Sequence, residues 1–424
     1  MKKLYSLIDK IYRRENLQAA FKAVKRNNGA PGIDGETVLD FANEVDANIE
    51  RLHVELATNT YVPKPVRRVE IPKADGGTRP LGIPTVRDRV VQQAFVNVVE
   101  PYFDKDFHPS SYGYRKGRSQ HQAVAKASMF MKKHGLEHVV DMDLSKCFDT
   151  LNHDLLIEAV AQKVSDGRVL KLVRQFLESG IMTDGVFTAT EVGSPQGGVC
   201  SPLLSNIYLD YFDQRMMKKG IRIVRYADDI LIFAGTKKEA GDYKNLATKV
   251  LEEELKLTVN REKTHLTSLQ EGVSFLGFIL RRNSTGIDTK RVKRFKDKVR
   301  EITKRNQPAP LEVIIKKLNP VLRGWLNYYR IADIKKLITG LTEWIRRRLR
   351  MIKMKQWKTY KKMHKELRRK GIRHNGLKMN VTLWKNSNVH IIHQLMPNAY
   401  FSELGLMDMC RHEVGLLSGN KVAW

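Results

Sequence analysis

Two adjacent aspartates, Asp228 and Asp229, interrupt the apolar and β-branched stretch IRIVRYADDILIF at residues 221–233. Aspartate is depleted from strands, and two neighbouring carboxylates repel each other. The flanking runs are typical of a buried β-hairpin with Ala227 and Asp228 at its turn. A solvated turn is the alternative, but unpaired carboxylates beside buried strands are costly. The pattern therefore favours a functional role for the pair.

A third carboxylate ends another short strand. Residues 138–144, HVVDMDL, have the composition of a strand, and Asp143 lies near its end. If this strand and the hairpin are neighbours in one sheet, Asp143, Asp228 and Asp229 converge at one edge. Clustered carboxylates need cations, and ligands that are all oxygen favour Mg²⁺. Two such ions about 3.5–4 Å apart can activate a 3′-hydroxyl and stabilise a leaving pyrophosphate.

The distribution of charge indicates the class of partner. The chain has 75 Lys and Arg against 46 Asp and Glu, a net charge of +29, which favours nucleic acid as a polyanionic partner. Residues 291–370 hold 27 Lys and Arg against 6 Asp and Glu, a net charge of +21. An anionic membrane surface or a ribosome-like assembly is the alternative. Solubility alone would not require such a concentration in one segment.

Several protein classes are disfavoured by the sequence. No apolar run reaches the roughly 18 residues of a membrane span, so no membrane association is expected. The charged N-terminus lacks an apolar signal core, so a cytoplasmic location is expected. Cys147, Cys200 and Cys410 are far apart and provide neither a disulfide framework nor a zinc-binding pair. We expect all three to be buried, reduced thiols.

The pattern of apolar residues predicts a mixed α/β core followed by a basic, helical segment. Helices are expected over most of residues 1–60 and over 86–104. A further helix should run from Ser201-Pro202 to about Gly220. Residues 66–84 predict a β-hairpin that turns at Asp75-Gly76-Gly77. The run FLGFIL, residues 275–280, predicts one short strand, and basic helices follow from about residue 290.

Five motifs occur in one order along the chain. They are DMDLSKCFD (141–149), GSPQGGVCSPLLSNIYL (193–209), RYADD (225–229), LKLTVNREKTHL (255–266) and FLGF (275–278). Together they resemble the consecutive palm motifs of reverse transcriptases, specifically those encoded in group II introns. The later GWLNYYR (324–330) and IRRRLR…QWK (345–358) resemble the thumb, or maturase, domain of that family.

The resemblance runs from about residue 15 to about residue 375 and implies an α+β, right-hand polymerase. It implies fingers and a palm, with an antiparallel sheet and helices, followed by an all-helical thumb. The expected domains are an N-terminal extension with the first fingers elements (1–60), the fingers and palm (61–285), the thumb or maturase X domain (286–375) and a small appendage that contacts nucleic acid (376–424). A C-terminal endonuclease is not expected, because Cys410 has no cysteine partner after residue 290.

The resemblance also assigns catalytic and metal-binding residues. Asp143, Asp228 and Asp229 are expected to be catalytic and to hold two Mg²⁺ ions, for which Mn²⁺ can substitute. The backbone carbonyl of Leu144 is expected to supply a further oxygen ligand. Lys263 is a candidate acid toward pyrophosphate, although surface lysines are common.

Four residues are expected to bind the nucleotide. Lys73 and Arg79 would reach the triphosphate from the hairpin, where a guanidinium can contact two oxygens; a solvated basic hairpin is the alternative. Phe148 would exclude a ribose 2′-hydroxyl, which implies dNTP substrates; a simple core position is the alternative. Gln196 would lie near the incoming nucleotide and the primer.

The sequence thus predicts an RNA-directed DNA polymerase that extends a DNA primer on an RNA template. It is also expected to bind its group II intron RNA for splicing and mobility and to contact target DNA. One alternative is an intron-free reverse transcriptase that serves DNA repair or phage defence. Another is an RNA-binding splicing factor that makes little use of polymerisation. The oligomeric state is left open.

Overall fold

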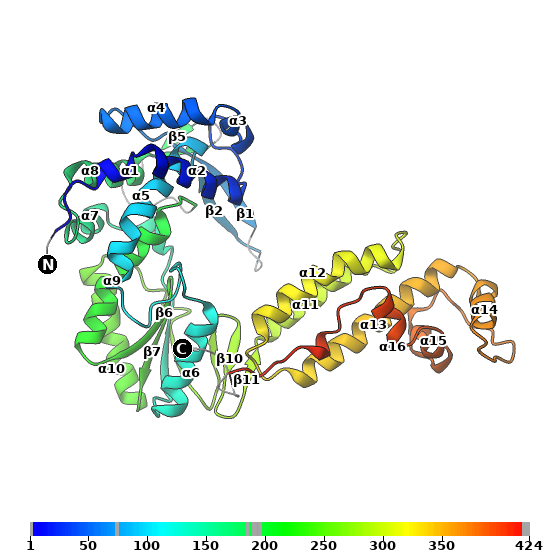
Figure 1. Cartoon of the computed structure of the whole chain (residues 1–424). Helices are drawn as coiled ribbons and strands as arrows, with labels where there is room; N and C mark the ends of the chain where they lie inside the picture. The colour runs from blue at the N-terminus through cyan, green and yellow to red at the C-terminus, as the bar shows by residue number, and fades with distance from the viewer. Residues whose placement is uncertain (1–2, 73–75, 184–185, 189–192, 194–196, 418–424) are drawn as a thin grey trace. The chain divides into compact units, whose positions relative to one another are not determined.

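The computed structural model of the chain describes residues 3–72, 76–183, 186–188, 193 and 197–417. The chain divides into two compact units, Met1–Ser268 and Leu269–Trp424, and Figure 1 draws the elements of both. Among the described residues, the N-terminal unit combines helices with two sheets, and the C-terminal unit is mostly helical with one small sheet. The predicted α+β fold class is therefore confirmed.

Helices form the first part of the N-terminal unit, as the apolar spacing predicts. Their bounds are Ile8–Ile11 (α1), Arg14–Asn27 (α2), Val38–Asn43 (α3) and Val45–Ala57 (α4). The next helix, α5 (Val86–Asp104), begins where the sequence predicts because the Thr85 hydroxyl accepts the backbone N–H of Asp88. Buried side chains such as Leu17 and Phe95 join these helices to one hydrophobic core.

The predicted hairpin of residues 66–84 is confirmed. Strands β1 (Val66–Pro72) and β2 (Thr78–Ile83) pair antiparallel, with Pro72 opposite Thr78 nearest the turn. Two short strands extend this sheet: β4 (Ile181–Thr183) runs parallel to β1, and β5 (Val186–Thr188) pairs with β4. The end of the hairpin near its turn is exposed, so the side chains there are open to solvent.

A second sheet brings the aspartate-bearing strands together. Its strands, in spatial order, are β6 (Arg222–Tyr226), β7 (Asp229–Ala234), β3 (His138–Met142) and β8 (His265–Ser268). All neighbours are antiparallel, and Met142 of β3 lies opposite Ile230 of β7. The prediction that the 138–144 strand and the hairpin are neighbours in one sheet is therefore confirmed.

Helices pack on both faces of this second sheet (Figure 1). On one face, α9 (Ser201–Lys218) and α10 (Lys237–Lys249) share a core with Ile230 and Ile232. On the other face, α6 (Gln120–Lys133) places the ring of Phe130 5.3 Å from that of Phe233. Successive residues of β7 point to opposite layers, and both layers are apolar. This arrangement explains why the ILIF run is continuously hydrophobic.

Shorter helices complete the N-terminal unit. They are the 3₁₀ turn Cys147–Thr150 (η1), α7 (His153–Ala161), α8 (Gly167–Glu178) and the π-helical turn Val250–Glu254 (η2). The first of them, η1, begins five residues after the end of β3 and so lies close to Asp143 in the chain.

The C-terminal unit begins with a small antiparallel sheet. Its strands, in spatial order, are β11 (Thr285–Ile287), β10 (Phe278–Leu280) and β9 (Val273–Phe275). The prediction of a single strand over residues 275–280 is therefore wrong. Leu276 and Gly277 both have positive φ angles, 51° and 82°, and form a two-residue turn that folds β10 back on β9. Two such residues reverse the chain in a tight hairpin.

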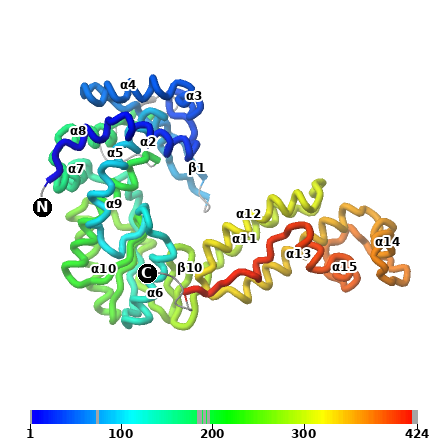
Figure 2. The backbone as a smooth tube through the Cα atoms, viewed as in Figure 1, coloured from blue at the N-terminus to red at the C-terminus, as the bar shows by residue number. Residues whose placement is uncertain are grey.

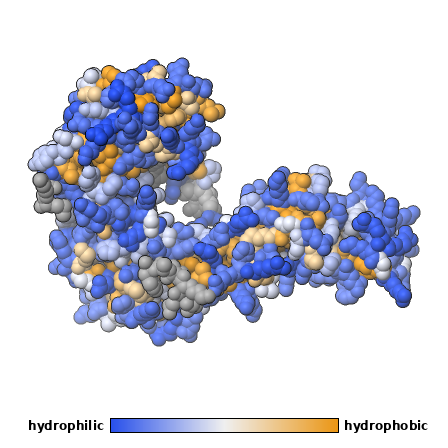
Figure 3. Space-filling view, in the orientation of Figure 1, coloured by the Kyte–Doolittle hydropathy of each residue, from blue (hydrophilic) through white to orange (hydrophobic). Residues whose placement is uncertain are grey.

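The basic segment folds into helices, as predicted. Their bounds are Thr289–Ile302 (α11), Leu311–Tyr329 (α12), Lys335–Trp357 (α13), Tyr360–Arg369 (α14), Trp384–Asn388 (η3), His390–Leu395 (α15), Asn398–Glu403 (α16) and Met409–Arg411 (η4). Figure 2 traces these helices in yellow to red. In Figure 3 most of the visible surface of this unit is hydrophilic, with small hydrophobic areas.

Aromatic residues between the basic ones pack largely against each other. The ring of Trp325 lies 4.5 Å from Phe295 and 5.2 Å from Tyr329, and Tyr328 stacks on Phe278 at 5.7 Å. These aromatics therefore stabilise the helices of the C-terminal unit. Their alternation with lysine and arginine is explained by packing, and it does not require that they stack on bases.

Two features bear on the disfavoured protein classes. Cys147 and Cys200 are buried, but Cys410 is exposed, so the prediction of three buried thiols is wrong for Cys410. Met409 occupies the inward position of the short turn η4, and the exposed Cys410 that follows donates its thiol to the Thr342 hydroxyl at 3.6 Å. Within the part of the chain that the structure describes, no helix is long and apolar enough to cross a membrane.

A buried ion pair connects α9 to β6. Arg225 of β6 and Asp213 of α9 are both fully buried, and the guanidinium contacts both carboxylate oxygens, with the shortest distance 2.6 Å. Arg225 also donates to the side chain of Asn206 and to the carbonyl of Ala227, at 2.9 and 3.0 Å. One guanidinium thus links the helix to the hairpin turn that carries Asp228.

We predict that Asp213→Asn lowers the free energy of unfolding of the N-terminal unit by about 3–5 kcal/mol, because it leaves the buried Arg225 charge without its partner. Urea denaturation followed by circular dichroism measures the change. The matched control is Arg215→Gln, which removes an exposed ion pair with Glu254 and should leave the midpoint unchanged. Equal midpoints for the two variants would contradict the proposed importance of the buried pair.

Candidate active site

The turn between β6 and β7 places Asp228 at the tip of a hairpin. Tyr226 pairs with Asp229, so Ala227 and Asp228 form the turn. Ala227 has a φ of 58°, a left-handed conformation that is unfavourable for a residue with a side chain. The surroundings hold it there: a Cβ on Gly113 would come within 2.3 Å of the Ala227 nitrogen. Asn206 donates to the Gly113 carbonyl at 2.9 Å and fixes this close approach.

Asp143 lies one residue beyond β3 and is held by the segment before β8. Its backbone N–H donates to the Thr264 hydroxyl at 3.2 Å, and its carbonyl accepts the Asn260 N–H at 2.9 Å. The Asn260 side chain donates to the Asp143 carboxylate at 3.1 Å, and the Lys263 ammonium lies 3.3 Å from the same oxygen. The Asp143 carboxylate is therefore oriented by an amide and neutralised by a lysine.

The carboxylates affect one another electrostatically. Desolvation by surrounding protein, followed by repulsion from Asp228, Asp141 and Asp143, raises the pKa of Asp229 to about 7, although the residue keeps contact with solvent. Desolvation and then Asp143 raise the pKa of Asp228. Asp141, which the sequence reasoning missed as a member of this cluster, has its pKa raised to about 6, mainly by burial. The structure thus brings all three predicted aspartates into one charged cluster.

A divalent cation fits the chemistry of this cluster. The donors are all carboxylate oxygens that carry excess negative charge, and Asp143 already takes a cationic partner, Lys263. Among the described residues, however, no group of three or more His, Cys, Asp or Glu side chains is close enough to hold one metal ion. Mutual repulsion opposes a closer approach of carboxylates that have no cation between them. The predicted ligands are therefore neighbours, and one or two of them at a time could hold an ion that takes its other oxygens from water or substrate phosphates.

The backbone at Leu144 is compatible with its predicted role. Leu144 and Val259 form an isolated antiparallel bridge. The hydrogen bonds of this bridge are made by the flanking residues, from the Ser145 N–H to the Thr258 carbonyl and from the Asn260 N–H to the Asp143 carbonyl. The bridge and the burial of the Leu144 side chain together fix the backbone of Leu144 next to Asp143.

The predicted nucleotide-binding residues fall into two groups. Arg79 is exposed on β2, and its positive charge offsets part of the rise in the pKa of Asp228, so it acts on the same region as the cluster. Phe148 is half-buried on η1, close to Asp143 in the chain. Lys73 and Gln196 lie outside the described residues.

Tyr114 is a further residue of this region that the sequence reasoning missed. Its ring is 54% exposed and lies edge-on to Phe148, with 6.4 Å between the centroids. Burial of the hydroxyl, and then the negative charge of Asp228, raises the pKa of Tyr114. A signal was present in the sequence SYGYRKGRS, where Tyr114 directly follows the glycine that packs against the hairpin turn.

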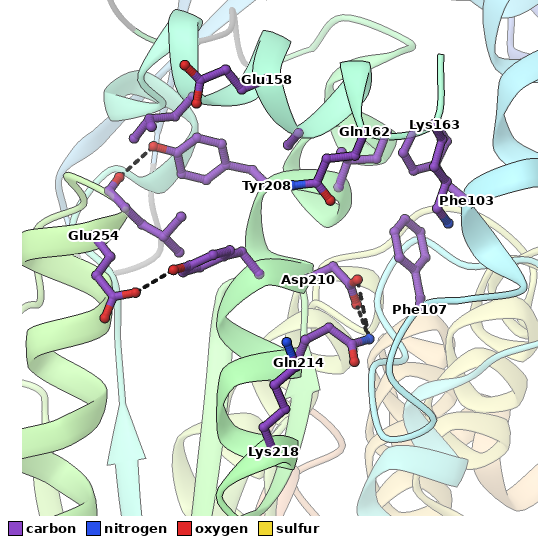
Figure 4. A pocket seen from close by; sticks show the side chains of 15 residues that line it. Phe103, Phe107, Glu158, Gln162, Lys163, Tyr208, Asp210, Gln214, Lys218 and Glu254 are labelled. Atoms are coloured by element: carbon purple, nitrogen blue, oxygen red, sulfur yellow. Dashed lines mark hydrogen bonds between the residues drawn. The ribbon is translucent and has the colours of Figure 1, made fainter. Parts of the chain in front are cut away.

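A cavity of about 490 Å³ lies elsewhere in the N-terminal unit (Figure 4). Its lining comes from α5, α7, α9 and η2, and it includes none of the three predicted catalytic aspartates. Polar groups in it bond to one another: Gln214 donates to Asp210, and the Tyr211 hydroxyl donates to Glu254. Burial raises the pKa of Asp210 to about 6. This cavity is separate from the carboxylate cluster and adds no ligand to it.

We predict that Asp229→Asn stabilises the metal-free protein at pH 8 and has no effect near pH 4. A carboxyl whose pKa is raised to about 7 on folding destabilises the folded state increasingly as the pH rises from about 4 to about 7. After allowance for solvent screening the gain should be about 1 kcal/mol. Thermal melts in EDTA across this pH range measure it. A gain that does not vary with pH would contradict the prediction.

Two protein families match parts of this chain. Residues 71–280 match the family described as "Reverse transcriptase (RNA-dependent DNA polymerase)", and this range contains all three aspartates. Residues 292–371 match "Group II intron, maturase-specific domain". The two matches follow the order of the motifs in the sequence.

Individual relatives are similar to large parts of this chain. "Protein YkfC" of Escherichia coli is 35% identical over 329 residues, which cover 68% of this chain and 86% of YkfC. "Group II intron-encoded protein LtrA" of Lactococcus lactis is 27% identical over 334 residues, 63% of this chain and 55% of LtrA, so this chain spans about half of that relative. A solved structure of apo telomerase from Candida tropicalis, truncated from its C-terminal domain, has a TM-score of 0.42 at 16% identity and covers 53% of this chain and 55% of that chain. The chain therefore belongs to the group II intron-encoded reverse transcriptases, in which a reverse transcriptase domain is followed by a maturase-specific domain.

Proposed function

We propose that the chain extends a primer 3′-hydroxyl with dNTPs on an RNA template. The observation that carries this proposal is the cluster of Asp143, Asp228 and Asp229, formed by two neighbouring strands inside the region that matches reverse transcriptases. Burial, and then repulsion within the cluster, raises the pKa of Asp228 and Asp229. A protein that only bound RNA would have no need for this electrostatically unfavourable arrangement.

We propose that the cluster holds two Mg²⁺ ions, for which Mn²⁺ can substitute. Asp143, Asp228 and Asp229 would provide carboxylate oxygens, and Leu144 would provide its carbonyl. When bound, such ions supply Lewis acidity for the 3′-hydroxyl and for the phosphates. The Asn260 amide orients the Asp143 carboxylate for this role. Lys263 neutralises Asp143 in the metal-free protein and is a candidate proton donor to the leaving pyrophosphate.

The nucleotide would bind between the hairpin and the end of β3. Arg79, with Lys73 and Gln196, would contact the triphosphate and the primer side. Phe148 would close against the sugar and exclude a 2′-hydroxyl, and the Tyr114 ring lies roughly perpendicular to it, with 6.4 Å between the centroids.

The basic segment supports a second role in RNA binding. Residues 291–370, with a net charge of +21, nearly coincide with the maturase-specific match at 292–371. We propose that this segment binds group II intron RNA for splicing and mobility, and that residues 376–424 contact nucleic acid, target DNA included. The domain boundaries 1–60, 61–285, 286–375 and 376–424 remain our working division. The structure divides more simply, after Ser268.

We predict that Asp143→Ala and Asp228→Ala each reduce primer extension on the order of 10³-fold, because each removes a carboxylate from the metal site. The assay is extension of a DNA primer on a defined RNA template with dNTPs and Mg²⁺. The matched control is Asp242→Ala, which removes an exposed carboxylate on α10 and should keep full activity. Absence of DNA product from a folded, RNA-binding wild type would overturn the polymerase proposal and favour a splicing factor.

We predict that Phe148→Val reduces the preference for dCTP over CTP by about 10- to 100-fold, because a smaller side chain leaves room for the 2′-hydroxyl. The ratio of kcat/KM for the two nucleotides measures this preference. Phe148→Tyr keeps the ring and should retain the discrimination. If Phe148→Val lost activity on both nucleotides equally, Phe148 would be a core residue and would have no selective role.

A further inference from the structure

Three arginines of α13 line one cavity in the C-terminal unit. The cavity has a volume of about 470 Å³, and Arg346, Arg347 and Arg350 form one side of it. Polar residues that follow much later in the chain form the other side. They are Asn388, His393 and Asn398, at the end of η3, in α15 and in α16. The cavity is thus built by a thumb-type helix together with the C-terminal segment.

Arg350 is buried without an acidic partner among its hydrogen bonds. It is 3% exposed, and its Nε donates to the Met396 carbonyl at 3.0 Å, while one Nη donates to the Asn398 side chain at 3.4 Å. Its guanidinium carbon lies 5.2 Å from the centre of the Phe401 ring. These partners hold the guanidinium in place without neutralising its charge. Burial lowers the pKa of Arg350 to about 10, as expected for an uncompensated cation.

The other two arginines also keep unused hydrogen-bonding capacity. The Arg347 guanidinium lies 3.9 Å from the centre of the Trp384 ring, which fixes its plane. Among the described residues, the buried Nε atoms of Arg347 and Arg346 have no hydrogen-bond partner. Arg346 lies 3.5 Å from Asp408, but that carboxylate also pairs with Arg411 at 3.7 Å. The cavity therefore contains more positive charge and more donors than its own acceptors satisfy.

Few groups in the lining oppose this positive charge. Glu343 is the acidic residue of the lining, and it is exposed. Burial and the nearby Arg350 lower the pKa of His393, so this imidazole is neutral at pH 7. Three guanidiniums thus face one exposed carboxylate. This composition favours a compact anion with several acceptor oxygens.

We propose that this cavity binds a backbone phosphate of a nucleic acid. A planar guanidinium contacts two phosphate oxygens at once, and aromatic rings hold Arg347 and Arg350 in position before the ligand arrives. The proposal rests on the proposed function in one respect, which is that a nucleic acid is the source of the phosphate. The proposed RNA-binding role rests on the net charge of residues 291–370, and the cavity adds a defined phosphate-binding site to it.

A second, smaller cavity on α13 favours a polymer over a free anion. Its volume is about 160 Å³, and its basic lining residues are Lys353, Arg369 and Lys370, with Glu366 as the acidic one. Arg346 and Lys353 are two helical turns apart, or roughly 10 Å along the axis. A chain with regularly spaced phosphates can occupy both cavities at once, whereas a single small anion fills only one.

The test uses the full-length protein in EDTA without dNTPs, so that binding is measured apart from polymerisation. The variants are Arg347→Gln, which removes a charge from the cavity, and Arg350→Lys, which keeps the charge but removes the planar fork. The matched control is Lys238→Gln, which removes one exposed charge from α10, outside the cavity and outside residues 291–370. The probes are inorganic phosphate, a single-stranded RNA and a DNA of the same sequence. The readouts are fluorescence anisotropy at several salt concentrations and thermal melting.

We expect Arg347→Gln to weaken RNA binding about 10-fold and to reduce the slope of log K against log salt by about 0.7, the value of one phosphate contact on a single strand. Arg350→Lys should weaken binding with an unchanged slope. Phosphate should raise the melting temperature of the wild type and of Lys238→Gln more than that of Arg347→Gln. The variants can lose binding to RNA alone, to DNA alone or to both, and this result identifies which nucleic acid supplies the phosphate.

The proposal would be overturned if Arg347→Gln and Arg350→Lys, folded by their melting curves, bound both nucleic acids as Lys238→Gln does. Primer extension by the wild type is measured separately. A wild type that cannot polymerise but shows the cavity-dependent binding would refute the polymerase proposal and leave this inference intact. If the wild type polymerises normally and the cavity variants do not change binding, the polymerase proposal stands and this inference is refuted.

Discussion

The buried ion pair between Arg225 and Asp213 holds together the parts that form the catalytic edge. Arg225 contacts α9 through its side chain and the hairpin turn through the Ala227 carbonyl. Its backbone bonds to Ser110 and Tyr112, so it also fixes the loop that leads to Tyr114. A guanidinium is suited to this position because it can donate several bonds in one plane. The pair stabilises the left-handed turn, which a hairpin without these contacts would not favour.

The position of the three aspartates was predictable because it follows from strand pairing. The apolar runs on each side of Asp228 required a hairpin, and the strand that ends near Asp143 required a neighbour in a sheet. The antiparallel register, with Met142 opposite Ile230, then places Asp143 next to Asp229. The start of α5 and the apolar spacing of α11 to α13 were predictable for similar reasons, since each depends on residues close together in the chain.

Other features depend on contacts that sequence spacing does not encode. The run FLGFIL looks like one strand because Leu276 is an apolar residue, although it adopts a positive φ in a tight turn. Tyr114 joins the active-site region only through long-range packing, whereas Asp141 lies on β3, two residues before Asp143. The hydrogen bonds that orient Asp143 come from Asn260 and Thr264, more than a hundred residues away. The charge of residues 291–370 was evident, but the sharing of a cavity by α13 and the C-terminal segment was not.

This shared cavity has a consequence for how the protein can be recombined. Arg346, Arg347 and Arg350 come from α13, inside the maturase-specific region, whereas Asn388, His393 and Asn398 lie beyond residue 371, where that match ends. A boundary drawn from family matches alone would cut the cavity in two. A hybrid that takes only its C-terminal segment from a relative would combine two sides of the cavity from different proteins. Exchanging α13 together with the segment avoids this mismatch. We therefore expect α13 and the C-terminal segment to be inherited together.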